Sequence, residues 1–153
     1  MNRLLIGCGI AALVVVGALV TVITIGILRA HDEQAEAEKA SREAILSFVT
    51  TWNEEELIKR AEDDLKTEEM RAKLTKLFAV CRQRVGTFKS LGKGTGTVNW
   101  NYFVAGQNNG YTANYSFPAT FSSGPATIEI RSHKGPAGWK IVFFTIRSDA
   151  LGP

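Results

Sequence analysis

The side chains that could carry acid–base or metal chemistry are few and widely spaced in this sequence. The two histidines are His31, which precedes Asp32, and His133, which stands beside an expected hairpin turn. A zinc site or a nucleophile–base pair needs such groups to converge, and nothing in this spacing brings them together. We therefore predict solvated histidines, and no catalytic residue, metal site or cofactor.

Acidic residues form two short runs, at positions 54–56 and 62–64. A cation site is one interpretation. The other is that these carboxylates lie on solvated faces near helix N-termini, where they favour the helix dipole. We expect the second arrangement.

Basic side chains dominate the region that follows, because no acidic residue occurs between Glu69 and Glu129. The pattern is compatible with an ordinary polar helix face. It is also compatible with contact to anionic lipid headgroups or an acidic partner, where each charge near a membrane adds about 1 kcal/mol. The residues expected to make that contact are Arg71, Lys73, Lys76, Arg82, Arg84 and Lys89.

Two further motifs indicate structural rather than catalytic or ligand-binding roles. The segment 92–96 (Gly-Lys-Gly-Thr-Gly) lacks the spacing of a phosphate loop and precedes a strand, so we expect a joint or bulge. Cys81 lies on an apolar helical stripe and is expected to be a buried, inert thiol. A disulfide between Cys8 and Cys81 is not expected.

The N-terminal region is apolar without a charge from Leu4 to Leu28. About 20 such residues cross a bilayer as a helix, whereas the apolar region of a cleaved signal peptide spans only about 7–15. Residues 1–30 are therefore predicted to be a single-pass anchor in the cell membrane. The Lys and Arg count leans slightly against a cytoplasmic N-terminus, but the plan of a signal anchor favours one, with the soluble domain outside.

Hydrophobic periodicity then predicts an α+β domain. Residues 31–52 read as a helix, whose polar early turns (31–44) form a stalk, and the soluble domain spans 45–150. Asn53 and Thr67 are expected to cap two more helices. Alternation between residues 97 and 146 predicts strands. The expected fold is two or three helices on a curved four- to five-stranded antiparallel meander.

The last strand differs from the others because apolar residues occur on both of its faces. Ile141 and Phe143 fall on one face, and Val142, Phe144 and Ile146 on the other. We therefore expect both faces of this strand to be covered.

Two segments carry a family resemblance: Val85-Gly86-Thr87-Phe88 and the ending Gly138-Trp139-Lys140-Ile141-Val142-Phe143-Phe144-Thr145-Ile146-Arg147-Ser148. With the helices-then-sheet order, they resemble nuclear transport factor 2-like or cystatin-like domains. The resemblance implies a cone with a pocket at its open end. Enzymatic members place Asp, His or Tyr in that pocket, but no Asp or His falls on an inward strand position here. The pocket residues expected are Trp100, Tyr102, Tyr111 and Tyr115.

A second likeness concerns the overall plan. A single membrane helix, a small α/β domain and a late Trp in a glycine-rich sheet are similar to bacterial relatives of a cytochrome oxidase assembly factor.

The resulting functional expectation is a membrane-anchored, non-catalytic binding or scaffolding domain. Its partners would be membrane lipid and either another protein or a small apolar ligand. The alternatives are an oxidase assembly factor-like protein and a small-molecule isomerase or hydrolase that uses the cone pocket. Nucleic acid is not expected, because the net charge is only +3 and the aromatic residues fall at core-facing positions.

Overall fold

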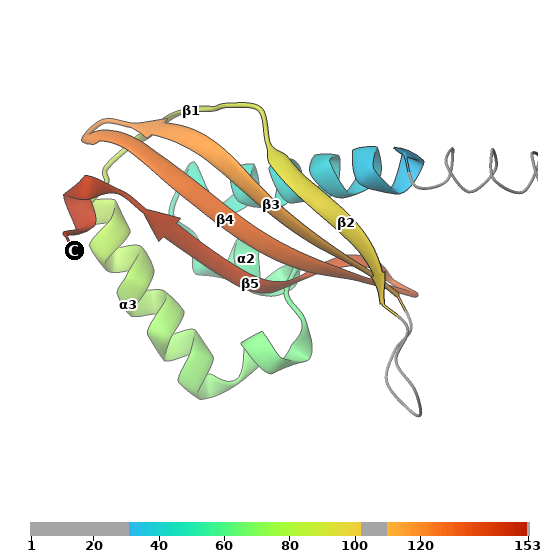
Figure 1. The fold of residues 1–153 in the computed structure, drawn as a ribbon. Helices are drawn as coiled ribbons and strands as arrows, with labels where there is room; N and C mark the ends of the chain where they lie inside the picture. Colours follow the sequence, from blue (N-terminus) through green and yellow to red (C-terminus); the bar gives the residue numbers. More distant parts are fainter. Residues whose placement is uncertain (1–30, 102–109, 153) are drawn as a thin grey trace, which may run out of the picture. The chain divides into compact units, whose positions relative to one another are not determined.

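A computed structural model of the chain describes residues 31–101 and 110–152 (Figure 1). It divides the chain into two compact units, Met1–Glu33 and Gln34–Pro153, and the fold below is that of the second. Within the described residues, no helix combines the length and apolarity needed to cross a membrane. The predicted anchor, residues 1–30, lies outside them.

Three helices precede the sheet, as the sequence predicted. The first occupies residues 31–49, and α2 (Glu54–Lys59) and α3 (Glu68–Arg84) follow, separated by the 3-10 turn η1 (Asp63–Lys66). Both predicted caps are confirmed. Asn53 Oδ1 accepts a hydrogen bond from the Glu55 amide at 3.0 Å, and Thr67 Oγ1 accepts one from the Met70 amide at 3.3 Å.

The first helix contributes to the core well before its end. Ala37, Ser41 and Ala44 are buried, although they fall in the predicted stalk of residues 31–44. The compact unit begins at Gln34.

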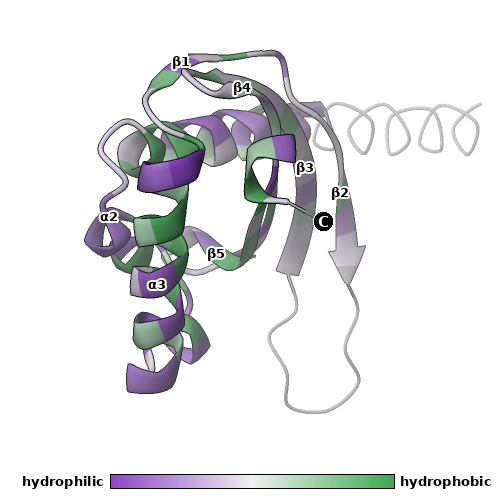
Figure 2. Ribbon diagram, turned by 90° about the vertical axis from the view of Figure 1, so that its left-hand side faces the viewer, coloured by the Kyte–Doolittle hydropathy of each residue, from purple (hydrophilic) through white to green (hydrophobic). Residues whose placement is uncertain are grey.

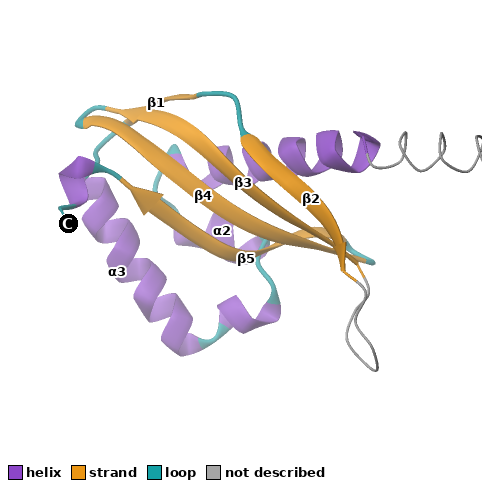
Figure 3. Ribbon diagram, in the orientation of Figure 1, coloured by secondary structure: helices purple, strands orange, loops and turns teal. Residues whose placement is uncertain are grey.

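The five strands are antiparallel and form one open sheet, shown in orange in Figure 3. They are β1 (Phe88–Leu91), β2 (Thr95–Asn101), β3 (Gly110–Phe121), β4 (Gly124–Gly135) and β5 (Gly138–Arg147), and the 3-10 turn η2 (Asp149–Leu151) follows. β3, β4 and β5 run in order as a meander. β1 and β2 both pair with β3. β1 pairs with the last residues of β3, and β2 pairs with the first residues of β3. The sequence predicted the meander but not this shared partner.

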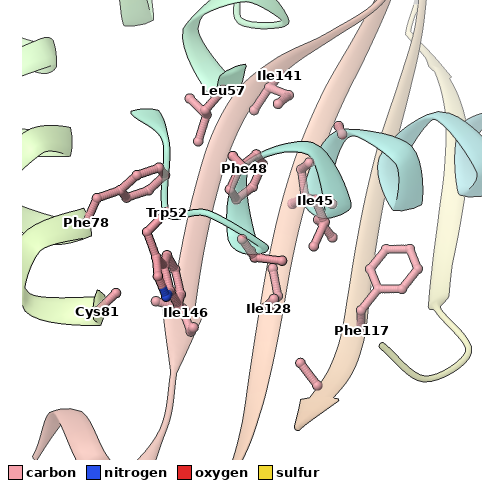
Figure 4. Close-up of a cluster of buried hydrophobic side chains, with 14 of the residues drawn as sticks. Ile45, Phe48, Trp52, Leu57, Phe78, Cys81, Phe117, Ile128, Ile141 and Ile146 are labelled. Carbon is pink, nitrogen blue, oxygen red and sulfur yellow. The ribbon is translucent and has the colours of Figure 1, made fainter. Parts of the chain in front are cut away.

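All three helices lie on one side of the sheet, as the second view shows (Figure 2). Alternate residues of β3 (Ala113, Tyr115, Phe117, Ala119 and Phe121) are buried on the side that faces them. We call this side the inner face. Figure 4 shows side chains from helices and strands meeting in this layer, and the ring of Phe48 lies 4.9 Å from that of Phe144 and 5.8 Å from that of Phe78.

The prediction that both faces of β5 are covered is wrong, because Phe143 is exposed. Ile141 was also expected on the same face as Phe143, and a β-bulge explains why it is not. Arg131 pairs with Phe143 but the next residue of β4, Ser132, pairs with Ile141, so Val142 is an extra residue. The extra residue shifts the alternation by one position. Ile141 and Ile146 are therefore both buried although their numbers differ in parity, and Phe143 remains 46% exposed on the opposite side.

Candidate binding site on the outer face of the sheet

The predicted pocket residues do not gather around one cavity among the described residues. Trp100 and Tyr111 form a cross-strand pair with ring centroids 4.6 Å apart. Tyr115 is buried, and its hydroxyl donates to the Gln34 carbonyl at 2.9 Å. Burial, and secondarily the charge of Glu38, raises the pKa of this phenol above its usual value. Tyr102 lies outside the described residues.

The space between helices and sheet is occupied by side chains. Trp52 stacks on Phe121 with centroids 5.4 Å apart, and its indole donates to the Gly86 carbonyl at 2.8 Å. Within the described residues, the buried polar or charged side chains are those of Ser41 and Ser132. The Cys81 thiol is buried as well, and this burial raises its pKa to about 11. The thiol is therefore protonated at neutral pH, as an inert cysteine would be.

His133 has a partner that its sequence neighbours did not indicate. Its Nδ1 lies 3.6 Å from Glu62 Oε1, across the hollow that these residues form with Asp63, Asp64, Leu65 and Val142. A hydrogen bond from Lys66, at 2.8 Å, holds the pKa of the Asp63 carboxyl below its usual value. Over the described part of the chain, no three metal-ligating side chains of the His, Cys, Asp or Glu type come together.

The predicted basic contact surface is largely engaged within the protein. Arg71 pairs with Glu55 at 2.9 Å and Lys73 with Glu69 at 2.6 Å. Arg82 and Arg84 donate to the carbonyls of Trp52 and Leu151. Lys76 is exposed on α3 and Lys89 on β1. The six residues therefore extend over a helix and a strand, and four of them already have partners.

The side of the sheet opposite the helices, here called the outer face, carries mainly hydroxyl and amide side chains. Cross-strand pairing fixes one row across four strands, made of Thr97, Asn114, Arg131 and Phe143. The adjacent row contains Thr95, Ser116, Glu129 and Thr145. Neighbours in a row stand about 4.5–5.5 Å apart, so their side chains contact one another.

Arg131 is the centre of this face. Its Nε donates to Asn114 Oδ1 at 2.6 Å, and its guanidinium carbon lies 5.8 Å from the centroid of the Phe143 ring. The neighbouring carboxylate of Glu129 accepts a hydrogen bond from Arg147 at 3.0 Å. A bonded neighbour on one side and a ring on the other restrict the orientations of the guanidinium.

Between the two rows the surface is hollowed. The hollow has a volume of about 290 Å³. It is lined by Thr95, Asn114, Tyr115, Ser116, Glu129, Ile130, Arg131 and Phe143. One cation, an exposed aromatic ring and several hydroxyl groups are suited to orienting a ligand.

Sequence reasoning did not single out this site. Alternation had placed Glu129 and Arg131 opposite the apolar residues of their strand, and that was the available signal. The exposure of Phe143 beside Arg131 was not expected, because both faces of its strand were predicted to be covered.

Comparison with protein-family models, with curated proteins and with solved structures finds no match to this chain. The resemblance to nuclear transport factor 2-like or cystatin-like domains thus remains a prediction from the sequence, and the fold observed is an α+β arrangement with a five-stranded antiparallel sheet.

Proposed function

We propose that this protein is a membrane-anchored, non-catalytic binding domain that engages another protein through the outer face of its sheet. The observation that carries the proposal is the hollow around Arg131, on a face that the three helices leave uncovered. The apolar stretch from Leu4 to Leu28 supports the membrane anchor.

Binding is preferred over catalysis because of what fills the fold. Phe48, Phe78 and Phe117 are among its fully buried side chains, and they occupy the layer where a cone-shaped enzyme would hold substrate. An isomerase or hydrolase needs an ionisable group in such a pocket. Among the described residues, the buried ionisable groups there are the Cys81 thiol, whose pKa is raised to about 11, and the phenol of Tyr115, which already donates to a backbone carbonyl.

Lipid contact alone explains the function of the soluble domain less well than protein binding does. The basic side chains that would have contacted headgroups are distributed over α3 and β1, and Arg71 and Lys73 are neutralised by glutamates. The anchor supplies attachment, which leaves the folded domain to bind something else.

Photocrosslinking from native membranes tests the proposal. The full chain would carry p-benzoylphenylalanine at Thr97, which is exposed on the outer face, or at Gln83, which is exposed on α3. We expect a discrete protein adduct from position 97 and none of the same mass from position 83. Adducts from position 83 alone, or only lipid adducts from position 97, would contradict the proposal.

Membrane attachment is tested by fractionation. The full chain should remain in the membrane pellet after alkaline carbonate washing, and a chain lacking residues 1–30 should be recovered in the supernatant. Recovery of the full chain in the supernatant would refute the anchor.

A further inference from the structure

The chemistry around Arg131 indicates which kind of partner the outer face accepts. Resting on the function proposed above, we infer that the hollow binds an extended segment of a partner protein in which a carboxylate side chain, Asp or Glu, is followed by an apolar one. The carboxylate would pair with the guanidinium of Arg131 and the apolar side chain would cover the ring of Phe143.

Arg131 has donors to spare for a ligand. Its hydrogen bond to Asn114 uses Nε, and within the described residues its two terminal nitrogens donate no hydrogen bond. A guanidinium presents its N–H groups in a planar fork that matches the two oxygens of a carboxylate. Asn114 and Phe143 restrict this fork before any ligand arrives, so less conformational entropy is lost on binding.

The carboxylate that already lines the hollow does not occupy Arg131. Glu129 is bonded to Arg147 at 3.0 Å, and the pair is close to neutral in charge. One positive charge, that of Arg131, is thereby left uncompensated. A singly charged carboxylate matches that balance, whereas a phosphate group carries about −1.5 to −2 at neutral pH and exceeds it.

Phe143 explains the apolar component of the ligand. The ring is 46% exposed, and pairing with Arg131 places Phe143 on the outer face. Aromatic side chains with adjacent arginines are typical of protein-binding surfaces. The hydroxyls of Thr95 and Ser116, on the other side of the hollow, can accept or donate hydrogen bonds to an extended backbone.

Nuclear magnetic resonance of the full chain in zwitterionic micelles provides the test. The probes are N-acetyl-aspartyl-phenylalaninamide, its asparaginyl counterpart and its phosphoseryl counterpart. We expect the aspartyl peptide to shift the amide resonances of Asn114, Arg131 and Phe143, and to bind about tenfold or more tightly than the asparaginyl peptide, as a charge-assisted pair requires.

Two variants separate the site from general electrostatics. Arg131→Gln should reduce the affinity for the aspartyl peptide by about tenfold. Lys89→Gln removes the same charge from exposed β1 and should leave this affinity unchanged. Retained spectra of both variants would show that they fold. Equal binding of the aspartyl and asparaginyl peptides, equal binding by Arg131→Gln and the unaltered protein, or preference for the phosphoseryl peptide would each overturn the inference.

The two proposals fail in different experiments. If position 97 still crosslinks to a partner protein but peptide binding ignores Arg131, the outer face binds a partner by other chemistry. If crosslinks arise from α3 alone, the outer-face function fails whichever peptide binds.

Discussion

The two faces of this sheet are built from the same strands and yet have different compositions. Towards the helices, β3 presents Ala113, Tyr115, Phe117, Ala119 and Phe121, and these side chains are buried. Towards the outside, the intervening residues of β3 are Thr112, Asn114, Ser116, Pro118 and Thr120. A period of two residues is enough to give one face the buried core and to leave polar side chains on the other, where we propose recognition.

The outer face is unusual in only one place. Most of its side chains are small and polar, as a solvated sheet face requires. Phe143 is the exception, because it is a large hydrophobic side chain that is 46% exposed and pairs with Arg131 on this face. The comparison therefore teaches that an exposed aromatic ring among polar neighbours, and not the alternation that both faces share, marks the candidate site.

The largest expected effect is on the inner face. Phe48 is fully buried and contacts the rings of Phe78 and Phe144, so Phe48→Ala should reduce the free energy of unfolding by about 3–5 kcal/mol. Phe143→Ala removes the same side chain from the outer face and should cost less than about 1 kcal/mol. The measurement is the urea midpoint of the full chain in micelles, followed by tryptophan fluorescence. Equal losses would remove the distinction between the faces.

A smaller loss is expected where β2 joins the sheet. A Cβ on Gly96 would lie 2.2 Å from the Asn114 carbonyl oxygen and 2.6 Å from Tyr115 Cδ1, so Gly96→Ala must displace backbone. We expect it to destabilise the fold by about 1–3 kcal/mol, measured by the same midpoint. Gly135→Ala is the control, since its Cβ would meet nothing within 4 Å. A neutral Gly96→Ala would show that β2 tolerates a shift against β3.

Local signals in the sequence predicted the elements well. Asn53 and Thr67 mark helix starts through side chains that satisfy free amides in the first turn. The apolar helical stripe predicted around Cys81 is confirmed, since Leu74, Phe78 and Cys81 are the buried residues of α3. These features depend on neighbours within a few positions, which is why the sequence alone contains them.

The features that the sequence did not predict depend on distant partners. The bulge at Val142 is defined by pairing with β4, and β1 is placed by hydrogen bonding to the end of β3. Similarly, Glu62 lies beside His133 because β5 bonds to the turn after α2 at Ile141. Tyr115 is a further example, because its hydroxyl donates to the carbonyl of Gln34, a residue far away in the sequence.

An effect confined to alkaline pH is expected from the inner face. The pKa of Cys81 is raised from its ordinary value of 9.0 to about 11 in the folded chain. The unfolded chain releases this proton first, so the stabilising contribution is complete below pH 9 and is lost as the pH rises through about 11. Comparison with Cys81→Ala isolates this thiol from Tyr115, whose pKa is also raised.

The measurement for Cys81 is the difference in urea midpoint between the unaltered chain and Cys81→Ala from pH 8 to 11. As the pH rises, the urea midpoint of the unaltered chain should fall relative to that of Cys81→Ala. A constant difference would show that the thiol is accessible in the folded state and that this part of the inner layer is open to water.

The smallest effect is expected from the ion pair on the outer face. Glu129 and Arg147 form a bond of 3.0 Å, but the arginine side chain is 72% exposed, and exposed pairs contribute about 0–1 kcal/mol. A double-mutant cycle with Glu129→Gln and Arg147→Gln should therefore give a coupling energy near the lower end of that range. Arg147→Gln should nevertheless reduce the affinity for the aspartyl peptide, because it leaves the negative charge of Glu129 without its partner beside Arg131. A strong coupling with unchanged peptide binding would mean that the pair serves the fold, and that the outer face is not reserved for recognition.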